Sequence, residues 1–156
     1  MELFSSVDMD IAIKLFLAAS LGAIIGVERE IAQKMAGMRT HSLVSLGSAL
    51  FSIISALPQV TGTVDPTRIA AQVVTGIGFL GGGIIVFSQK DEKVRGLTTA
   101  ASVWLAAAIG MAVAFNYYMA ATFATVLALV ILIAFWWIEQ KIIKPIALRS
   151  RPEQVD

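Results

Sequence analysis

Long apolar stretches alternate with short charged segments along this chain. An α-helix needs roughly 20 mainly apolar residues to cross the hydrocarbon core of a membrane. Asp, Glu, Lys and Arg are absent from residues 40–64, 69–89 and 96–138. Each of the first two runs has the length of one membrane-spanning helix, and the third has the length of two.

A tight turn is predicted in the middle of the third run, at Asn116. Asparagine favours turns, and the rings of Tyr117 and Tyr118 prefer the membrane interface. A further apolar segment follows Asp10 and contains Lys14, whose long stem can carry its ammonium group toward the helix end. This segment adds one more helix.

The pattern predicts an all-α fold, a polytopic membrane protein with a bundle of five transmembrane helices. The expected helices cover about residues 10–27, 42–57, 69–88, 97–115 and 118–138. Together they form one membrane domain over residues 1–138, and residues 139–156 form a short basic tail.

The positive charges give these helices an orientation. Ten of the 12 Lys and Arg residues fall in the connection after the first helix, the connection after the third helix, and the tail. In an alternating five-helix arrangement these three segments lie on one side, and loops rich in Lys and Arg lie in the cytoplasm. We therefore expect the N-terminus outside and the C-terminus in the cytoplasm.

Composition supports the bilayer as the solvent. Hydrophobic residues make up 57% of the chain, charged residues make up 15%, and the mean hydropathy is +0.79. Soluble domains are about 45 to 50% apolar and about 25% charged. The chain has no cysteine, which excludes disulfides, thiolate zinc sites and cysteine nucleophiles.

The stretch TGIGFLGGGIIVF contains a G-x-G-x-x-G pattern at Gly76, Gly78 and Gly81. A dinucleotide site needs a strand before this pattern and an acid about 20 residues after it. The glycines instead lie inside a segment of membrane-spanning length, and the residue 20 positions after Gly81 is Ala101. We expect neither a nucleotide nor a nucleic acid as a partner.

Close helix packing is the first alternative for these glycines. Small residues four positions apart let two helix backbones approach in a membrane. Gly78 and Gly82 form one such pair and Gly22 and Gly26 form another, so the first and third helices are expected to touch. The second alternative is a helix broken at its glycines, with carbonyl groups that coordinate ions.

Hydroxyl groups follow one face of the second helix. Ser45, Ser48 and Ser52 lie at spacings of three and four residues, in line with further serines at each end. Such a stripe serves either as packing between helices or as a polar path through the bundle.

Mixed charge gathers at the cytoplasmic ends of the helices, where the functional centre is predicted. The candidates are Glu28, Arg29, Arg39, Arg95 and Thr98. Charges at a membrane boundary are often simply solvated. In the functional alternative, Glu28 pairs with Arg39 or Arg95, because a charge removed from water needs a partner.

Metal binding has few candidate ligands. His41 is the only histidine, and the acids lie near helix ends or in loops. Mg²⁺ prefers oxygen ligands and could meet carboxylates at the cytoplasmic ends or carbonyls and hydroxyls deeper in the bundle. The metal ligands are therefore unknown, no cofactor is expected, and Mg²⁺ is a candidate ligand or transported ion.

Four motifs, GAIIGVERE, AGMRTHSLVSLGSALF, RIAAQVVTGIGFLGGGIIV and VRGLTTAASVWLAAAIGM, resemble the MgtC/SapB family of bacterial inner-membrane proteins. The resemblance implies a five-helix membrane domain and a link to magnesium limitation and magnesium transport. It also implies an alternative role, since members of the virulence branch act as regulators that bind the membrane ATP synthase.

The chain departs from the virulence branch in three places. That branch has Asn at the position of Thr98, Cys at the position of Leu105, and a folded cytoplasmic domain after the last helix. The SapB-like membrane core is the closer match. We expect a non-enzymatic protein of the inner membrane, linked to magnesium homeostasis, that forms a homodimer and has either transport or binding of a membrane-protein partner as its role.

Overall fold

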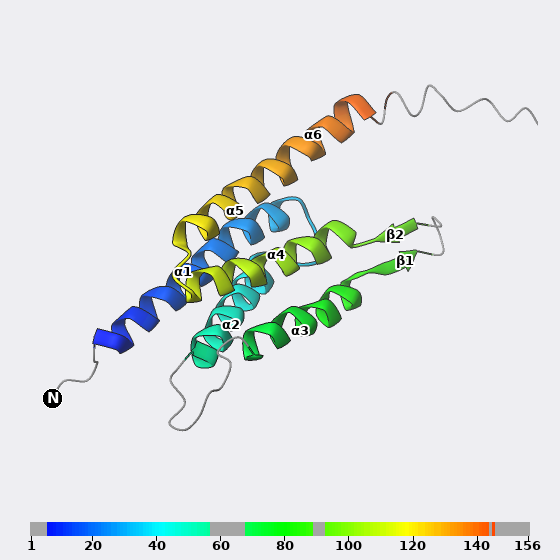
Figure 1. The fold of residues 1–156 in the computed structure, drawn as a ribbon. Coiled ribbons are helices and arrows are strands. Elements are labelled where there is room, and N and C mark those ends of the chain that lie inside the picture. Colours follow the sequence, from blue (N-terminus) through cyan, green and yellow to red (C-terminus); the bar gives the residue numbers. More distant parts are fainter. Residues whose placement is uncertain (1–5, 57–67, 89–92, 144, 146–156) are drawn as a thin grey trace, which may run out of the picture.

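A bundle of helices forms the protein (Figure 1). The computed structural model describes residues 6–56, 68–88, 93–143 and 145. The main helices are α1 (Ser6–Ile31), α2 (Met38–Ala56), α3 (Arg68–Ile84), α4 (Leu97–Ala114) and α5 (Tyr118–Val130). The last helical stretch continues through η1 (Ile131–Phe135), α6 (Trp136–Ile138) and η2 (Glu139–Ile143), of which η1 and η2 are π-helical.

The helical prediction is confirmed, with corrections at the helix ends. The first helix is longer at both ends than predicted, and the second begins at Met38. The last helical stretch continues five residues into the segment predicted as tail, to Ile143. Among the described residues, three helical stretches are long and apolar enough to cross a membrane, at Val7–Ile31, Leu97–Ala114 and Tyr118–Ile143. The five crossings and their orientation stay predictions.

A small β-hairpin replaces the predicted end of the third helix. The helix ends at Ile84, and β1 (Val86–Ser88) pairs antiparallel with β2 (Lys93–Arg95). Gly96 then adopts a φ of 90° before α4 begins. A Cβ at Gly96 would lie 3.1 Å from the Ile84 carbonyl carbon, so glycine fits both the backbone conformation and the close approach to α3.

Helix α4 forms the centre of the bundle. It contacts α1, α2, α3 and α5, and its buried residues include Val103, Ala106, Ile109 and Val113. The predicted turn after α4 is confirmed at Asn116, which has a φ of 66° and accepts a hydrogen bond of 2.8 Å from the Tyr118 hydroxyl. This turn returns the last helical stretch along α4 and α1 (Figure 1).

The close glycine contacts join α1 to α2, where the sequence predicted contact between α1 and α3. A Cβ at Gly22 would lie 2.5 Å from the His41 carbonyl oxygen, and one at Gly26 would lie 2.5 Å from the Met38 Cα. In contrast, a Cβ at Gly78 or Gly82 would meet nothing within 4 Å. The predicted seam through these four glycines is wrong, because the side of α3 that carries Gly78 and Gly82 faces outward.

One end of the bundle brings the base-rich segments together. It consists of the α1–α2 connection, the β1–β2 hairpin and the end of the last helical stretch, and is called the basic end below (Figure 1). The Glu30 carboxylate accepts a 2.9 Å hydrogen bond from the Met38 backbone N–H here. A negative charge at this position also suits the positive end of the α2 dipole.

Candidate functional site

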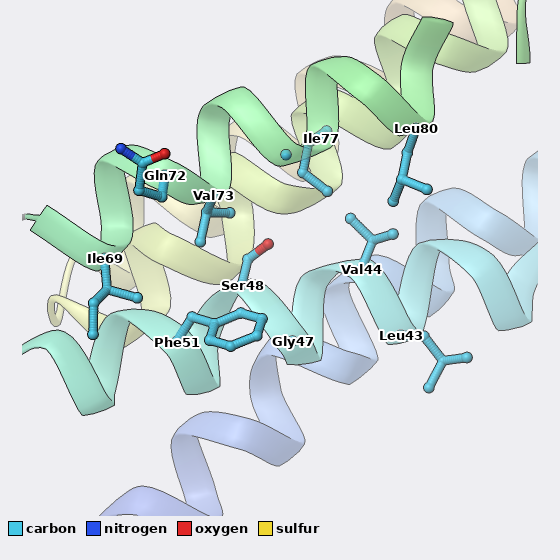
Figure 2. Close-up of a pocket in the computed structure, with 11 residues that line it drawn as sticks. Leu43, Val44, Gly47, Ser48, Phe51, Ile69, Gln72, Val73, Ile77 and Leu80 are labelled. Atoms are coloured by element: carbon cyan, nitrogen blue, oxygen red, sulfur yellow. The ribbon is translucent and has the colours of Figure 1, made fainter. Parts of the chain in front are cut away.

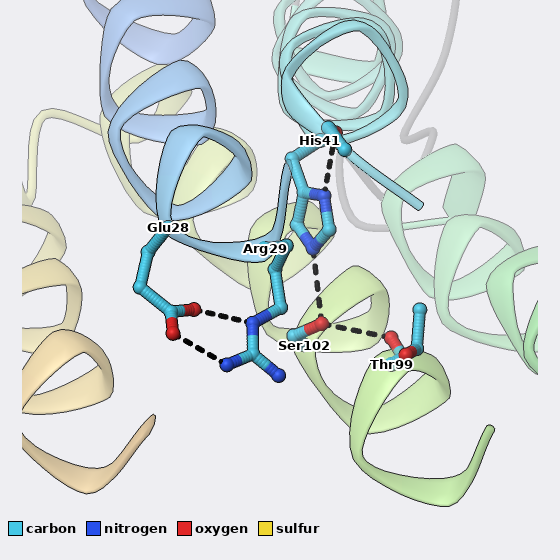
Figure 3. Close-up of polar contacts among 6 residues, drawn as sticks. Glu28, Arg29, His41, Thr99 and Ser102 are labelled. Carbon is cyan, nitrogen blue, oxygen red and sulfur yellow. Dashed lines mark hydrogen bonds and ion pairs between the residues drawn. The ribbon is translucent and has the colours of Figure 1, made fainter. Parts of the chain in front are cut away.

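Five polar residues from α1, α2 and α4 meet at the basic end (Figure 3). They are Glu28, Arg29, His41, Thr99 and Ser102, and they are called the polar centre below. Arg29, His41, Thr99 and Ser102 are buried. Polar groups in such surroundings need hydrogen-bond partners, because burial removes their contacts with water.

The charged part of the polar centre is an ion pair between neighbours in sequence. The Arg29 Nε donates to one oxygen of the Glu28 carboxylate, and Nη2 donates to the other oxygen at 2.7 Å. The Arg29 side chain is 4% exposed and that of Glu28 is 17% exposed. Such bidentate geometry is the strong form of an arginine–carboxylate pair, and it compensates for the desolvation of both charges.

The second part of the polar centre links α2 to α4 through His41. Its Nδ1 lies 2.9 Å from the Gly37 carbonyl oxygen, and its Nε2 lies 3.0 Å from the Ser102 Oγ. The Ser102 hydroxyl donates to the Thr99 carbonyl oxygen at 2.8 Å. Because that hydroxyl has a single proton, all three hydrogen bonds form together only when both ring nitrogens of His41 carry protons.

The predicted partner of Glu28 is wrong. The sequence suggested Arg39 or Arg95, whereas the structure pairs Glu28 with Arg29, its neighbour at the end of α1. Arg39 lies exposed in the first turn of α2, and Arg95 lies exposed at the end of β2. Thr98 is also exposed, in the first turn of α4. The functional roles predicted for these residues stay predictions.

Sequence reasoning did not place His41, Thr99 and Ser102 together. His41 and Ser102 are 61 positions apart, and spacing along the chain carries no information about contacts over that distance. The sole histidine beside a predicted helix start was the one available signal.

The serine stripe of α2 is buried in the bundle. Ser45, Ser48 and Ser52 are each at most 3% exposed. The Ser52 hydroxyl donates to the Ser48 carbonyl oxygen of its own helix at 2.8 Å. A Cβ at Gly22 would come within 2.8 Å of the Ser45 Cβ, so the stripe lies where α1 approaches α2. The Ser45 hydroxyl has no hydrogen-bond partner among the described residues.

The glycines of α3 separate into an inner and an outer group. A Cβ at Gly81 would lie 3.8 Å from the Ala100 Cβ on α4, whereas a Cβ at Gly76, Gly78 or Gly82 would meet nothing within 4 Å. The helix runs without a break from Arg68 to Ile84. The predicted alternative of a helix broken at its glycines is therefore wrong.

A groove of about 500 Å³ separates α2 from α3 (Figure 2). Its walls are mainly apolar, with Phe51 and Val44 on α2 and Val73 and Ile77 on α3. Ser48 contributes one hydroxyl to this apolar surface. Further lining residues are Leu43, Gly47, Ile69, Gln72, Gly76 and Leu80.

Metal-ligating side chains do not cluster in the part of the chain that the structure describes. No group of three or more His, Cys, Asp or Glu residues lies close enough there to hold a metal ion. Glu28 has its carboxylate engaged by Arg29, and Glu30 has its carboxylate at the start of α2.

Comparison with known proteins places this arrangement in a family. Residues 15–141 match the family described as the MgtC family. The chain belongs to the MgtC family. This membership and the apolar helices make the chain a membrane protein.

Named relatives agree with the membership. The chain is 44% identical over 131 residues to "Putative magnesium transporter YhiD" of Escherichia coli strain K12, covering 79% of this chain and 59% of the relative. It is 44% identical over 117 residues to "Protein MgtC" of Salmonella typhimurium strain 14028s, covering 75% and 48%. It is 50% identical over 91 residues to "Protein MgtC" of Brucella abortus strain 2308, covering 58% and 37%.

The MgtC-family chain therefore spans between 37% and 59% of the length of these relatives. No solved structure matches it.

Proposed function

We propose that the chain is a non-enzymatic regulator of the bacterial inner membrane, linked to magnesium homeostasis, that binds another membrane protein through the groove between α2 and α3. The observation that carries this proposal is the contrast between the two small-residue faces. The serine face of α2 packs inside the bundle, while most glycines of α3 lie on the outside.

The inner face gives little support to a polar path. Ser52 uses its hydroxyl on its own helix, and Ser45 packs beside Gly22 at the contact between α1 and α2. These serines therefore serve helix packing, which is the commoner use of hydroxyl groups in membrane bundles.

The outer face suits contact with another helix. Gly47 and Gly76 line the groove from opposite helices, and a Cβ on either would meet nothing within 4 Å. Helices associate in membranes by close packing, because lipid already satisfies their apolar side chains. A partner helix that enters the groove gains this packing at positions where the chain itself provides no neighbour.

Magnesium transport is the second candidate function, and the polar centre favours it. Ionisable residues in a membrane bundle are costly, and they often mark ion pathways. Glu28 and Arg29 lie at the basic end, where an ion would enter or leave the bundle.

A substitution in α3 tests the proposed regulator. Gly76→Leu fills the groove, whereas Gly83→Leu adds the same side chain to the same helix at an open position that does not line the groove. We expect Gly76→Leu to abolish growth in low magnesium at normal protein abundance, and Gly83→Leu to preserve it. Normal growth of the Gly76→Leu strain would contradict the proposal.

A flux assay separates the two functions. Proteoliposomes that contain the purified chain and an internal magnesium-sensitive dye are placed in external Mg²⁺. The regulator proposal expects dye signals equal to those of empty liposomes. Magnesium entry above that level, reduced by Glu28→Gln in folded protein, would favour transport.

The homodimer is a further part of the proposal, and closed two-fold assemblies are the commonest oligomers. The outward glycines of α3 that do not line the groove, Gly78, Gly82 and Gly83, support it, since a second copy can supply the missing neighbours. The oligomeric state is measured from the mass of the protein in lipid nanodiscs over a range of dilutions. A monomer at every dilution would contradict the homodimer.

A further inference from the structure

A second pocket, of about 470 Å³, opens at the basic end. Its walls come from the end of α1, the α1–α2 connection, the start of α4 and the last helical stretch. One wall is polar and the other is apolar, so the pocket matches a ligand with a charged group and a hydrocarbon part.

Two basic side chains form the polar wall. Arg29 is almost fully buried, and its hydrogen bonds to Glu28 use Nε and Nη2, which leaves Nη1 outside the ion pair. Lys34 lines the same pocket from the α1–α2 connection. Proteins commonly bind phosphate through the guanidinium group of arginine and the ammonium group of lysine.

The start of α4 adds further donors to this wall. Gly96, Leu97, Thr98 and Thr99 line the pocket, and no side chain caps the first turn of α4. The backbone N–H groups of a helix start favour anions, and the Thr98 hydroxyl supplies one more donor. These donors point to an anion as the charged part of the ligand.

The apolar wall comes from the last helical stretch. Ile131, Leu132 and Phe135 belong to the π-helical turn η1, and Trp136 follows it. Tryptophan favours the membrane interface, where lipid headgroups meet hydrocarbon. Trp136 and Phe135 are both more than half exposed, so this wall continues onto the outer surface of the bundle.

We propose that this pocket binds the phosphate group of an anionic phospholipid from the leaflet at the basic end. The phosphate lies against Arg29, Lys34 and the start of α4, and the acyl chain lies along Phe135 and the η1 surface. The apolar wall favours a lipid over free phosphate. Glu139 is the acidic side chain that lines the pocket, and it weakens the attraction for the lipid. This proposal is independent of the regulator and transport functions.

Native mass spectrometry of the purified chain tests the site. The protein is titrated with phosphatidylglycerol and, separately, with phosphatidylcholine that has the same acyl chains. Lys34→Gln should weaken phosphatidylglycerol binding about fivefold, because one base near a membrane surface contributes about that factor. Lys141→Gln is the matched control, since Lys141 is an exposed base near the same end that does not line the pocket.

Four further outcomes decide the proposal. Glu139→Gln should strengthen phosphatidylglycerol binding, and phosphatidylcholine should bind more weakly than phosphatidylglycerol to the unaltered chain. Equal effects of Lys34→Gln and Lys141→Gln would overturn the site. Displacement of phosphatidylglycerol by equimolar inorganic phosphate would overturn the lipid assignment and would indicate that the pocket binds free phosphate.

Discussion

The contact between α2 and α4 at Gly110 gives the sharpest test of the packing. A Cβ at Gly110 would overlap the Ser45 carbonyl oxygen and would lie 2.8 Å from its carbonyl carbon and 3.1 Å from its Cα. All three atoms belong to the backbone of α2, so no side chain can rotate away. Gly110→Ala therefore has to move one helix relative to the other.

The size of the effect follows from that movement. Ordinary contact begins at 3.4 Å, so clearing the carbonyl carbon alone requires the helices to separate by at least about 0.6 Å, and clearing the closer carbonyl oxygen requires more. A gap of that size loses roughly a quarter to a half of the dispersion energy of the atoms in the contact. Overpacking of this kind usually costs about 1 to 3 kcal/mol. We expect Gly110→Ala to lower the free energy of unfolding by about 3 kcal/mol, at the upper end of this range, because backbone meets backbone and α4 is the central helix.

Thermal unfolding of the purified protein in a mild detergent, followed by circular dichroism, measures this cost. For a chain of this length, about 3 kcal/mol corresponds to a fall in Tm of roughly 6 to 12 °C. Gly47→Ala is the control, since Gly47 also lies in a helix and a Cβ there would meet nothing within 4 Å. Alanine is the better helix former by up to about 1 kcal/mol, so this variant should unfold at the same or a higher temperature.

The expected result is a lower Tm for Gly110→Ala and an unchanged or higher Tm for Gly47→Ala. If the Tm of Gly110→Ala stays within about 2 °C of the unaltered chain, the close approach of α2 and α4 is wrong. If the Tm of Gly47→Ala falls as far as that of Gly110→Ala, the effect is due to glycine replacement in general, and the argument from the contact between α2 and α4 fails.

Three further substitutions or fusions test other parts of the structure. Arg29→Gln leaves the Glu28 carboxylate without its partner and should lower the free energy of unfolding by about 3 to 5 kcal/mol in the same melting assay; an unchanged Tm would contradict the buried ion pair. Ser102→Ala removes the group that His41 Nε2 contacts and should cost about 1 to 3 kcal/mol, and a neutral effect would show that the contact does not stabilise the fold. A reporter fused after Asp156 should be active only in the cytoplasm, and activity only in the periplasm would refute the predicted orientation.

The sequence by itself determined the class of fold and the approximate helices. Helix formation in a membrane depends on the length of an apolar run and on the position of charges, and both can be read along the chain. The turn at Asn116 was predictable for the same reason, because it depends on one residue and its neighbours. The four family motifs also lie in local stretches of sequence, and the family membership they suggested is confirmed.

The tertiary structure alone decided which faces meet. The glycine pairs on α1 and α3 have the same spacing, yet Gly22 contacts α2 whereas Gly78 faces outward. The spacing of glycines shows that one helix face carries small residues. The rotation of each helix about its axis decides what that face contacts. The same holds for His41 and Ser102, whose contact depends on how α2 and α4 pack across 61 positions of sequence. Helix identity is a local property of the chain, whereas packing depends on all the helices at once, and this difference separates what the sequence could predict from what required the structure.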